Sequence, residues 1–230
     1  MKYYMLFILI FPACCNLVVA QPGKSIRVKA GEDIAQAYSP QGFYRFPQFS
    51  KAILYFKGSS RNTGVLFNYN IFSGNMQFIS PKGDTLDLAN TSGLDSIVFE
   101  THAFVYNEGF MEVVAQIDSL KLLKKLILKN EVENIGAYGQ ANSTASITNV
   151  KTVIVGTSVY NLVVNQDVVL NENISWFFAN GNNIVKANKT NLLKLLTPEK
   201  QVKGEAYLKK NKTSFEREND LKKLLEAIGS

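Results

Sequence analysis

The sequence predicts a mainly β protein of the α+β type, in which an antiparallel meander forms a barrel-like or sandwich core and two or three helices follow at the C-terminus. Short β-branched and aromatic runs recur about every ten residues from residue 51, separated by turn residues. Near residue 187 the apolar pattern changes from alternation to helical spacing. With 46% hydrophobic and 19% charged residues in a chain of 230, the composition is that of a globular protein with a substantial core.

The first 20 residues have the three-part pattern of a cleaved secretory signal. Lys2 precedes the almost wholly apolar stretch 5–15, and Val18 and Ala20 are small residues at the positions that signal peptidase reads. The apolar stretch is short for a membrane span, and no later run of about 18 apolar residues exists. We therefore expect an exported protein that is periplasmic, outer-membrane-associated or extracellular, with no transmembrane helix after signal cleavage.

Removal of residues 1–20 would also remove both cysteines, Cys14 and Cys15. The mature chain is then expected to be free of disulfides and of thiol chemistry. Two alternatives stay open at this end of the chain. One is a lipoprotein signal at Cys14 or Cys15, although residues 11–13 fit a lipobox poorly, and the other is a retained N-terminal anchor.

Four segments follow from the pattern: a signal at 1–20, an irregular part at 21–50, an antiparallel β body at 51–186 and a basic helical part at 187–230. The irregular part is broken by proline and glycine, with a short edge strand expected over 26–29 and one helical turn over 31–37. In the β body, the turn residues Ser73-Gly74-Asn75 and Asn180-Gly181 indicate hairpins. Strands are expected at 52–56, 63–69, 76–79, 85–88, 96–100, 103–106, 110–116, 152–155, 160–164, 167–170, 174–179 and 182–186.

Two stretches within the β body are less regular. Residues 120–129 alternate leucine with lysine as a strand does, while three lysines also recur at helical spacing, and the alternation favours the strand. Residues 130–149 are rich in Asn, Gly, Ser and Thr and are predicted to form a long polar loop. The stretches 52–56 and 63–79 carry apolar residues on both faces, which favours a sheet covered on both sides, with the C-terminal helices as the candidate cover.

Helical signals dominate the C-terminal part. Thr197-Pro198-Glu199 is a typical helix start, and Leu221, Leu224, Leu225 and Ile228 have the spacing of one buried helix face. Residues 186–230 hold 11 basic and 6 acidic residues, whereas residues 21–185 are balanced. Such an excess favours anionic partners, although a solvated helix face has the same composition.

Five short motifs carry a resemblance to a known family: GVLFNYN at 64–70, GNMQFI at 74–79, KGDTL at 82–86, GAYG at 136–139 and the lysine- and leucine-rich pattern of 207–225. With these motifs the chain resembles a group of exported, β-rich proteins of Gram-negative envelopes that have no known activity. The resemblance spans most of the mature chain. It implies export from a bacterial cell and supports a strand over 120–129, but it transfers no functional residue.

The residues assemble no catalytic or metal-binding set. A Ser-His-Asp site would need His102, the single histidine, which is more typical here of a loop or a strand end. Asp84 and Asp87 bracket two residues and would point to opposite strand faces, unlike the close carboxylates of a retaining glycosidase. The phosphate-loop and calcium-loop patterns are missing, so we expect no catalytic residue, no cofactor and no metal.

The sequence therefore favours a non-enzymatic envelope module that binds or scaffolds an envelope protein or an anionic envelope surface. Nucleic acid is not an expected partner, because the basic tail has few aromatic residues for stacking. Two alternatives are a carboxylate-dependent hydrolase of envelope polysaccharide and a carrier of a small ligand or lipid in a β cavity. The candidate partner contacts are Lys209, Lys210, Lys212, Lys222, Lys223 and Trp176.

Overall fold

The structure is a computed structural model that describes residues 23–99, 101–135, 141–143, 163–164 and 167–230. The strands are β1 (Ser25–Val28), β2 (Ser50–Phe56), β3 (Ser59–Asn70), β4 (Asn75–Ile79), β5 (Thr85–Asp87), β6 (Leu94–Phe99), β7 (His102–Tyr106), β8 (Phe110–Ile117), β9 (Leu120–Ile135), β10 (Ala141–Ser143), β11 (Val168–Asn180) and β12 (Asn183–Lys186). The helices are α1 (Ile34–Tyr38), α2 (Lys189–Leu195), α3 (Pro198–Lys210) and α4 (Glu218–Gly229).

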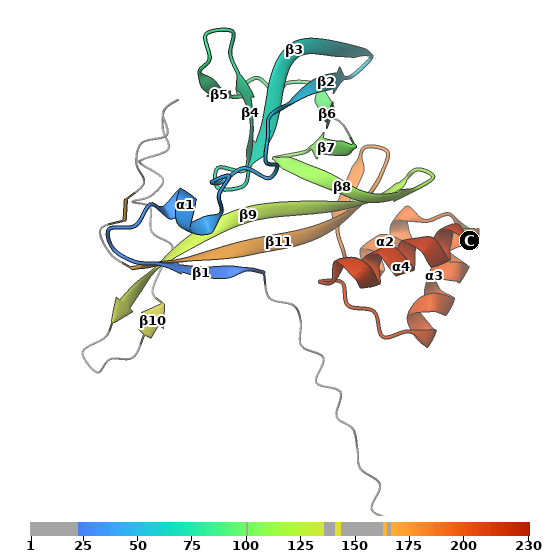
Figure 1. Ribbon diagram of the computed structural model, residues 1–230. Coiled ribbons are helices and arrows are strands. Elements are labelled where there is room, and N and C mark those ends of the chain that lie inside the picture. The colour runs from blue at the N-terminus through green and yellow to red at the C-terminus, as the bar shows by residue number, and fades with distance from the viewer. Residues whose placement is uncertain (1–22, 100, 136–140, 144–162, 165–166) are drawn as a thin grey trace, which may run out of the picture.

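The strands form one 12-stranded antiparallel sheet that does not close into a barrel. Its order is β1-β11-β9-β8-β7-β6-β2-β3-β4-β5, with β10 paired to β9 and β12 paired to β11. Consecutive strands from β2 to β9 are mostly neighbours, as hairpin turns between short strands dictate. The predicted fold class, a mainly β meander followed by C-terminal helices, is confirmed (Figure 1).

The long β9–β11 pair presents one face to two different cores. Leu122 lies opposite Phe178, and both are buried in the helix-side core, which α2, α3 and α4 share with β8, β9 and β11. Further along the same face, Leu128 and Leu170 are buried in the strand-side core, which includes β2, β3, β4, β6 and β7. A twisted sheet turns its face progressively along its strands, so one continuous face packs against both layers.

The C-terminal helices cover a different part of the sheet from the one that the sequence predicted. They pack on β8, β9, β11 and β12 rather than on residues 52–56 and 63–79. On the outer face of β2, Ile53 and Tyr55 remain 38% and 40% exposed. The reason is connectivity, because β12 pairs with β11 and α2 begins directly after it, which keeps the helices at that end of the molecule.

The polar loop predicted for residues 130–149 is wrong where the structure describes it. Strand β9 continues to Ile135, and β10 pairs with it in antiparallel register. The backbone pairing with β11 extends to Val132, and this pairing does not require apolar side chains. The predicted strands at 167–170 and 174–179 are parts of the single strand β11. The predicted strand at 152–155 lies outside the described residues, as does most of 160–164.

Two hydrogen bonds join the end of β3 to β9. They lie along the part of the β9 edge that is not paired with β8. The hydroxyl of Tyr69 donates to the carbonyl oxygen of Leu126 at 2.9 Å, and the amide of Leu128 donates to the carbonyl oxygen of Ile71 at 2.8 Å. Burial raises the pKa of Tyr69, and the nearby carboxylate of Glu112 raises it further. The phenol therefore stays protonated and acts as a donor that holds the sheet in its curled shape.

Tyr69→Phe is expected to lower the free energy of unfolding by about 1 kcal/mol, because a buried hydrogen bond is lost without a change in packing volume. Urea unfolding followed by circular dichroism measures this. Tyr106→Phe is the matched control, since the Tyr106 ring packs on Phe110 but its hydroxyl has no hydrogen-bond partner among the described residues. Equal stability of the two variants would contradict a role for the Tyr69 hydroxyl in the curl.

Candidate functional site

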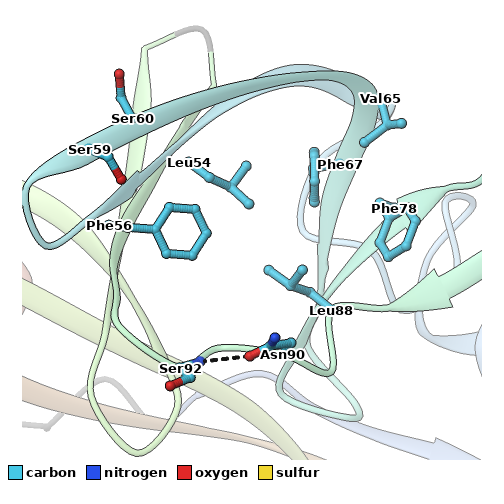
Figure 2. Close-up of a pocket in the computed structure, with 10 residues that line it drawn as sticks. All are labelled: Leu54, Phe56, Ser59, Ser60, Val65, Phe67, Phe78, Leu88, Asn90 and Ser92. Carbon is cyan, nitrogen blue, oxygen red and sulfur yellow. Dashed lines mark hydrogen bonds between the residues drawn. The ribbon is translucent and has the colours of Figure 1, made fainter.

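A cavity of about 770 Å³ lies on the inner side of the curled sheet, between β2, β3 and β4 and the β5–β6 connection. Figure 2 shows side chains from these elements around one empty space, with Leu54, Phe56 and Leu88 pointing into it. The lining residues are Leu54, Phe56, Ser59, Ser60, Val65, Phe67, Phe78, Leu88, Asn90 and Ser92. We call this space the β2–β6 cavity.

Strand alternation and one glycine shape the upper wall. Leu54 and Phe67 point inward and are buried, at 4% and 2% exposure, because alternate strand residues face opposite sides. Gly64 adopts a φ of +67°, and the β2–β3 register shifts between Lys51 and Ile53. A glycine in a left-handed conformation beside a register shift is typical of a bulge, which bends a strand. This bend makes β3 arch over the cavity (Figure 2).

The connection between β5 and β6 forms the opposite wall and is held at both ends. The amide of Leu88 donates to the carbonyl oxygen of Met76 at 2.8 Å, and the amide of Lys57 donates to that of Gly93 at 3.1 Å. Within the connection, the Asn90 side-chain oxygen accepts from the Ser92 amide at 3.2 Å. The wall therefore has a defined position in the protein before any ligand binds.

The chemistry of the lining is apolar with a neutral polar rim. Six lining side chains are aliphatic or aromatic, and the other four are three serines and one asparagine. Among the side chains that the structure describes, none that lines this cavity is charged. Such a surface can bury an apolar group and hydrogen-bond a polar one, which is the usual composition of a small-molecule site. The sequence allowed a β cavity as an alternative, but its pattern pointed to none of these lining residues. The feature that could have indicated them is the glycine within the predicted strand 63–69, because a glycine inside a strand suggests a bulge.

Arg45, His102 and Glu112 form a polar cluster at the edge of the strand-side core. Glu112 on β8 is 7% exposed and accepts from the guanidinium of Arg45 twice, at Nε with 3.0 Å and at Nη2 with 3.2 Å. His102 Nδ1 lies 3.4 Å from the same carboxylate, and its ring is 4.3 Å from that of Phe46. The two-pronged ion pair fixes residues 45–46 against β7 and β8, a structural arrangement. His102 stands at the start of β7, which agrees with one of the two positions predicted for it, a loop or a strand end.

The predicted lysine contacts are spread over the C-terminal helices. Lys209 and Lys210 end α3, Lys212 follows it, and Lys223 lies on α4; all four are exposed. Lys222 instead donates to Glu218 at 2.7 Å. Burial alone would raise the pKa of Glu218, but that hydrogen bond and the charge of Lys124 outweigh burial and hold the pKa below its usual range.

Trp176 lies inside the helix-side core rather than on the surface, with 6% exposure. Its indole N–H donates to the Glu216 carbonyl oxygen at 3.2 Å, and the Lys124 ammonium lies 5.7 Å from its ring. The structure thus separates Trp176 from the exposed lysines. A partner contact of these six predicted residues stays a prediction.

The two aspartates that sequence analysis weighed are also apart from the cavity. The carboxylate of Asp87 accepts from Asn75 Nδ2 at 2.9 Å and from Gln77 Nε2 at 2.6 Å. Asp84 is exposed in the turn before β5, where its amide donates to the Ser80 hydroxyl. Within the described ranges, no group of three or more His, Cys, Asp or Glu side chains could hold a metal ion.

The fold and the cavity define a class: an open, curled antiparallel sheet with an apolar hollow on its inner side and a helical C-terminal layer. Comparisons with protein-family models, curated proteins and solved structures find no match for the chain. The resemblance to exported envelope proteins therefore stays a prediction. Among the helices that the structure describes, none is long and apolar enough to cross a membrane.

Proposed function

We propose that this protein is an exported, non-enzymatic binding protein of the bacterial envelope whose ligand is an apolar small molecule held in the β2–β6 cavity. The observation that carries the proposal is an open cavity of about 770 Å³ lined by six apolar side chains. Its volume lies within the range of roughly 300–1,000 Å³ that is usual for ligand pockets. The secretory-signal pattern of residues 1–20 supports the cellular context.

Three features of the cavity favour ligand binding over a packing defect. Phe56, Phe78 and Leu88 are only partly buried, so apolar surface remains for a ligand to cover. Covering such surface contributes about 25 cal/mol per Å². Ser59 and Asn90 are exposed at the mouth of the cavity, where they can orient a ligand without being left unpaired. Both walls are held by backbone hydrogen bonds, which lowers the entropic cost of binding.

The alternative of a carboxylate-dependent hydrolase lacks comparable support. Such an enzyme needs two carboxylates in one cleft, at distances of about 5 to 9.5 Å. Within the described part of the chain, the lining of the β2–β6 cavity contains no acidic side chain, and Asp87 is engaged by Asn75 and Gln77 instead. The geometry therefore favours binding without catalysis as the function to test first.

Binding can be tested with N-phenyl-1-naphthylamine, an uncharged probe whose fluorescence rises in apolar sites. The mature chain is expected to bind it saturably, and Leu88→Trp is expected to weaken binding at least about tenfold, because the larger ring fills the cavity. Leu88 is half-buried on the β5–β6 connection, so the variant should keep its fold.

Leu66→Trp is the matched control for this experiment. Leu66 neighbours two cavity residues in sequence but points to the outer face of β3, where it is 38% exposed. The control should bind the probe as the unmodified chain does. Equal binding by Leu88→Trp and Leu66→Trp would place the probe elsewhere and reject the β2–β6 cavity as the site.

A further inference from the structure

We infer that a second hollow of this protein binds a neutral saccharide through the hydroxyls of its sugar rings. The hollow has a volume of about 300 Å³ and lies where the β2–β3, β7–β8 and β11–β12 turns meet the residues that lead into β6. Figure 1 shows the orange β11–β12 hairpin beside β7. We call this space the four-loop hollow. Among the described residues, none lines both this hollow and the β2–β6 cavity, so the inference goes beyond the proposed function.

Hydrogen bonds hold the walls of the four-loop hollow in place. The amide of Lys57 donates to the carbonyl oxygen of Gly93 at 3.1 Å, which joins the β2–β3 turn to the segment before β6. On the β7–β8 turn, the carbonyl oxygen of Glu108 accepts from the ammonium of Lys125 on β9 at 3.3 Å. The β11–β12 turn closes a paired hairpin. Because the protein itself positions these loops, a ligand meets a site with a smaller cost in ordering entropy.

The less exposed part of the lining is apolar. Leu94 is buried, and Val105, Tyr106 and Ile184 are half-buried. Val105 and Ile184 also pack against a small third apolar cluster that includes Leu123, which fixes their positions. The carbon-bound hydrogens of a sugar ring form an apolar face, and such a surface can cover that face.

Exposed polar side chains with charges of both signs line the rest of the hollow: Lys57, Asp95, Asn107, Glu108 and Asn182. The carboxylates accept hydrogen bonds, the ammonium donates them and the amides do both. A sugar hydroxyl also donates and accepts, so it can use every member of this set. A bare cation would meet the ammonium and a bare anion would meet the carboxylates, so the mixed set fits an uncharged, hydroxyl-rich ligand best. A glycosidase keeps its catalytic acid protonated by burial, whereas Asp95 and Glu108 are exposed, which favours binding without bond cleavage.

Glu108 has a backbone conformation that glycine would adopt more easily. Its φ is +51°, in the left-handed region that is unfavourable for residues with a Cβ. Asp118 in the β8–β9 turn has the same φ, and there the carboxylate pairs with Lys200 of α3. The carboxylate of Glu108 instead lines the four-loop hollow. A contact with a ligand gives a physical reason for a glutamate at a position where the backbone favours glycine.

The test uses heteronuclear NMR of the isotope-labelled mature chain with three neutral probes, maltotriose, cellotriose and triacetylchitotriose, each added up to about 10 mM. At least one probe is expected to shift the side-chain amide signals of Asn107 and Asn182 saturably, with a Kd of about 1 mM or lower. If none of the three probes shifts these signals, the inference is overturned. Shifts confined to residues outside the four-loop hollow would overturn it as well.

Two matched variants, Glu108→Gly and Asp118→Gly, locate the contact. Each removes one carboxylate at a φ of +51° and replaces it with a residue that adopts this φ without strain, so both should keep the fold. Glu108→Gly is expected to raise the Kd of the bound probe at least about fivefold, because a charged hydrogen-bond acceptor is lost. Asp118→Gly should leave the Kd unchanged. Equal Kd values for the two variants would overturn the inference, since the carboxylate at the hollow would then take no part in binding.

Discussion

Leu225→Ala is expected to lower the free energy of unfolding by about 3 kcal/mol, one of the two largest effects we expect from a single substitution in this protein. Leu225 lies on α4, is 1% exposed and belongs to the helix-side core with Leu122 and Phe178. Truncation removes three carbon atoms from a filled site and leaves a cavity that the sheet beneath α4 cannot close.

The single tryptophan allows this loss to be localised. Trp176 lies in the same core and donates to the Glu216 carbonyl oxygen just before α4. Its emission should therefore report release of the helices, while circular dichroism reports the sheet. In urea we expect the fluorescence midpoint of Leu225→Ala to fall with the destabilisation.

Val202→Ala is the control for this measurement. Val202 is 69% exposed on α3, so its truncation should change stability by less than about 0.5 kcal/mol. If Leu225→Ala were no less stable than Val202→Ala, the packing of α4 on β8 and β9 would be contradicted.

Leu225 is also an example of a structural feature that could be predicted from the sequence. The spacing of Leu221, Leu224, Leu225 and Ile228 predicted one buried helix face, and all four side chains are buried. Asn180-Gly181 likewise predicted the turn that joins β11 to β12. Both signals are local, because a helix stripe and a hairpin turn depend on residues a few positions apart.

The features that sequence reasoning missed depend on distant parts of the chain. The helices were assigned to the wrong strands because the order of strands, not the apolar pattern, decides which face a C-terminal helix reaches. The cavity arises where the bend at Gly64 meets a connection that returns from β5 to β6. Residues 130–135 continue β9 by backbone pairing, which composition does not reveal.

The contact of Glu112 with Arg45 is the clearest case of a long-range interaction that could not be predicted from the sequence. Its partner Arg45 is 67 positions away, in a segment that the sequence predicted to be irregular. Asn68 strengthens the same attachment, since its side-chain amide donates to the carbonyl oxygens of Phe46 and Gln48. Side chains therefore fasten residues 45–48 to the sheet, in addition to the backbone hydrogen bonds that Phe43 and Arg45 make with Ile71 and Tyr69.

Arg45→Met is expected to destabilise the protein by about 3 kcal/mol, because it leaves the buried carboxylate of Glu112 without its two-pronged partner. Methionine keeps an unbranched apolar stem like that of arginine and removes the guanidinium, so the loss reports chiefly the contacts of that charged group. Thermal and urea unfolding of the variant beside the unmodified chain give the value.

A double variant measures the coupling between Arg45 and Glu112 separately from the effect of each single substitution. With Glu112→Gln added to Arg45→Met, the buried position holds a neutral amide, and much of the lost stability should return. The two substitutions should therefore be strongly non-additive, with a coupling of more than about 1 kcal/mol. Additive losses would mean that Arg45 and Glu112 act independently, although Nε and Oε2 lie 3.0 Å apart. A non-additive result would show that the Arg45–Glu112 ion pair contributes to the attachment of residues 45–46 to the sheet.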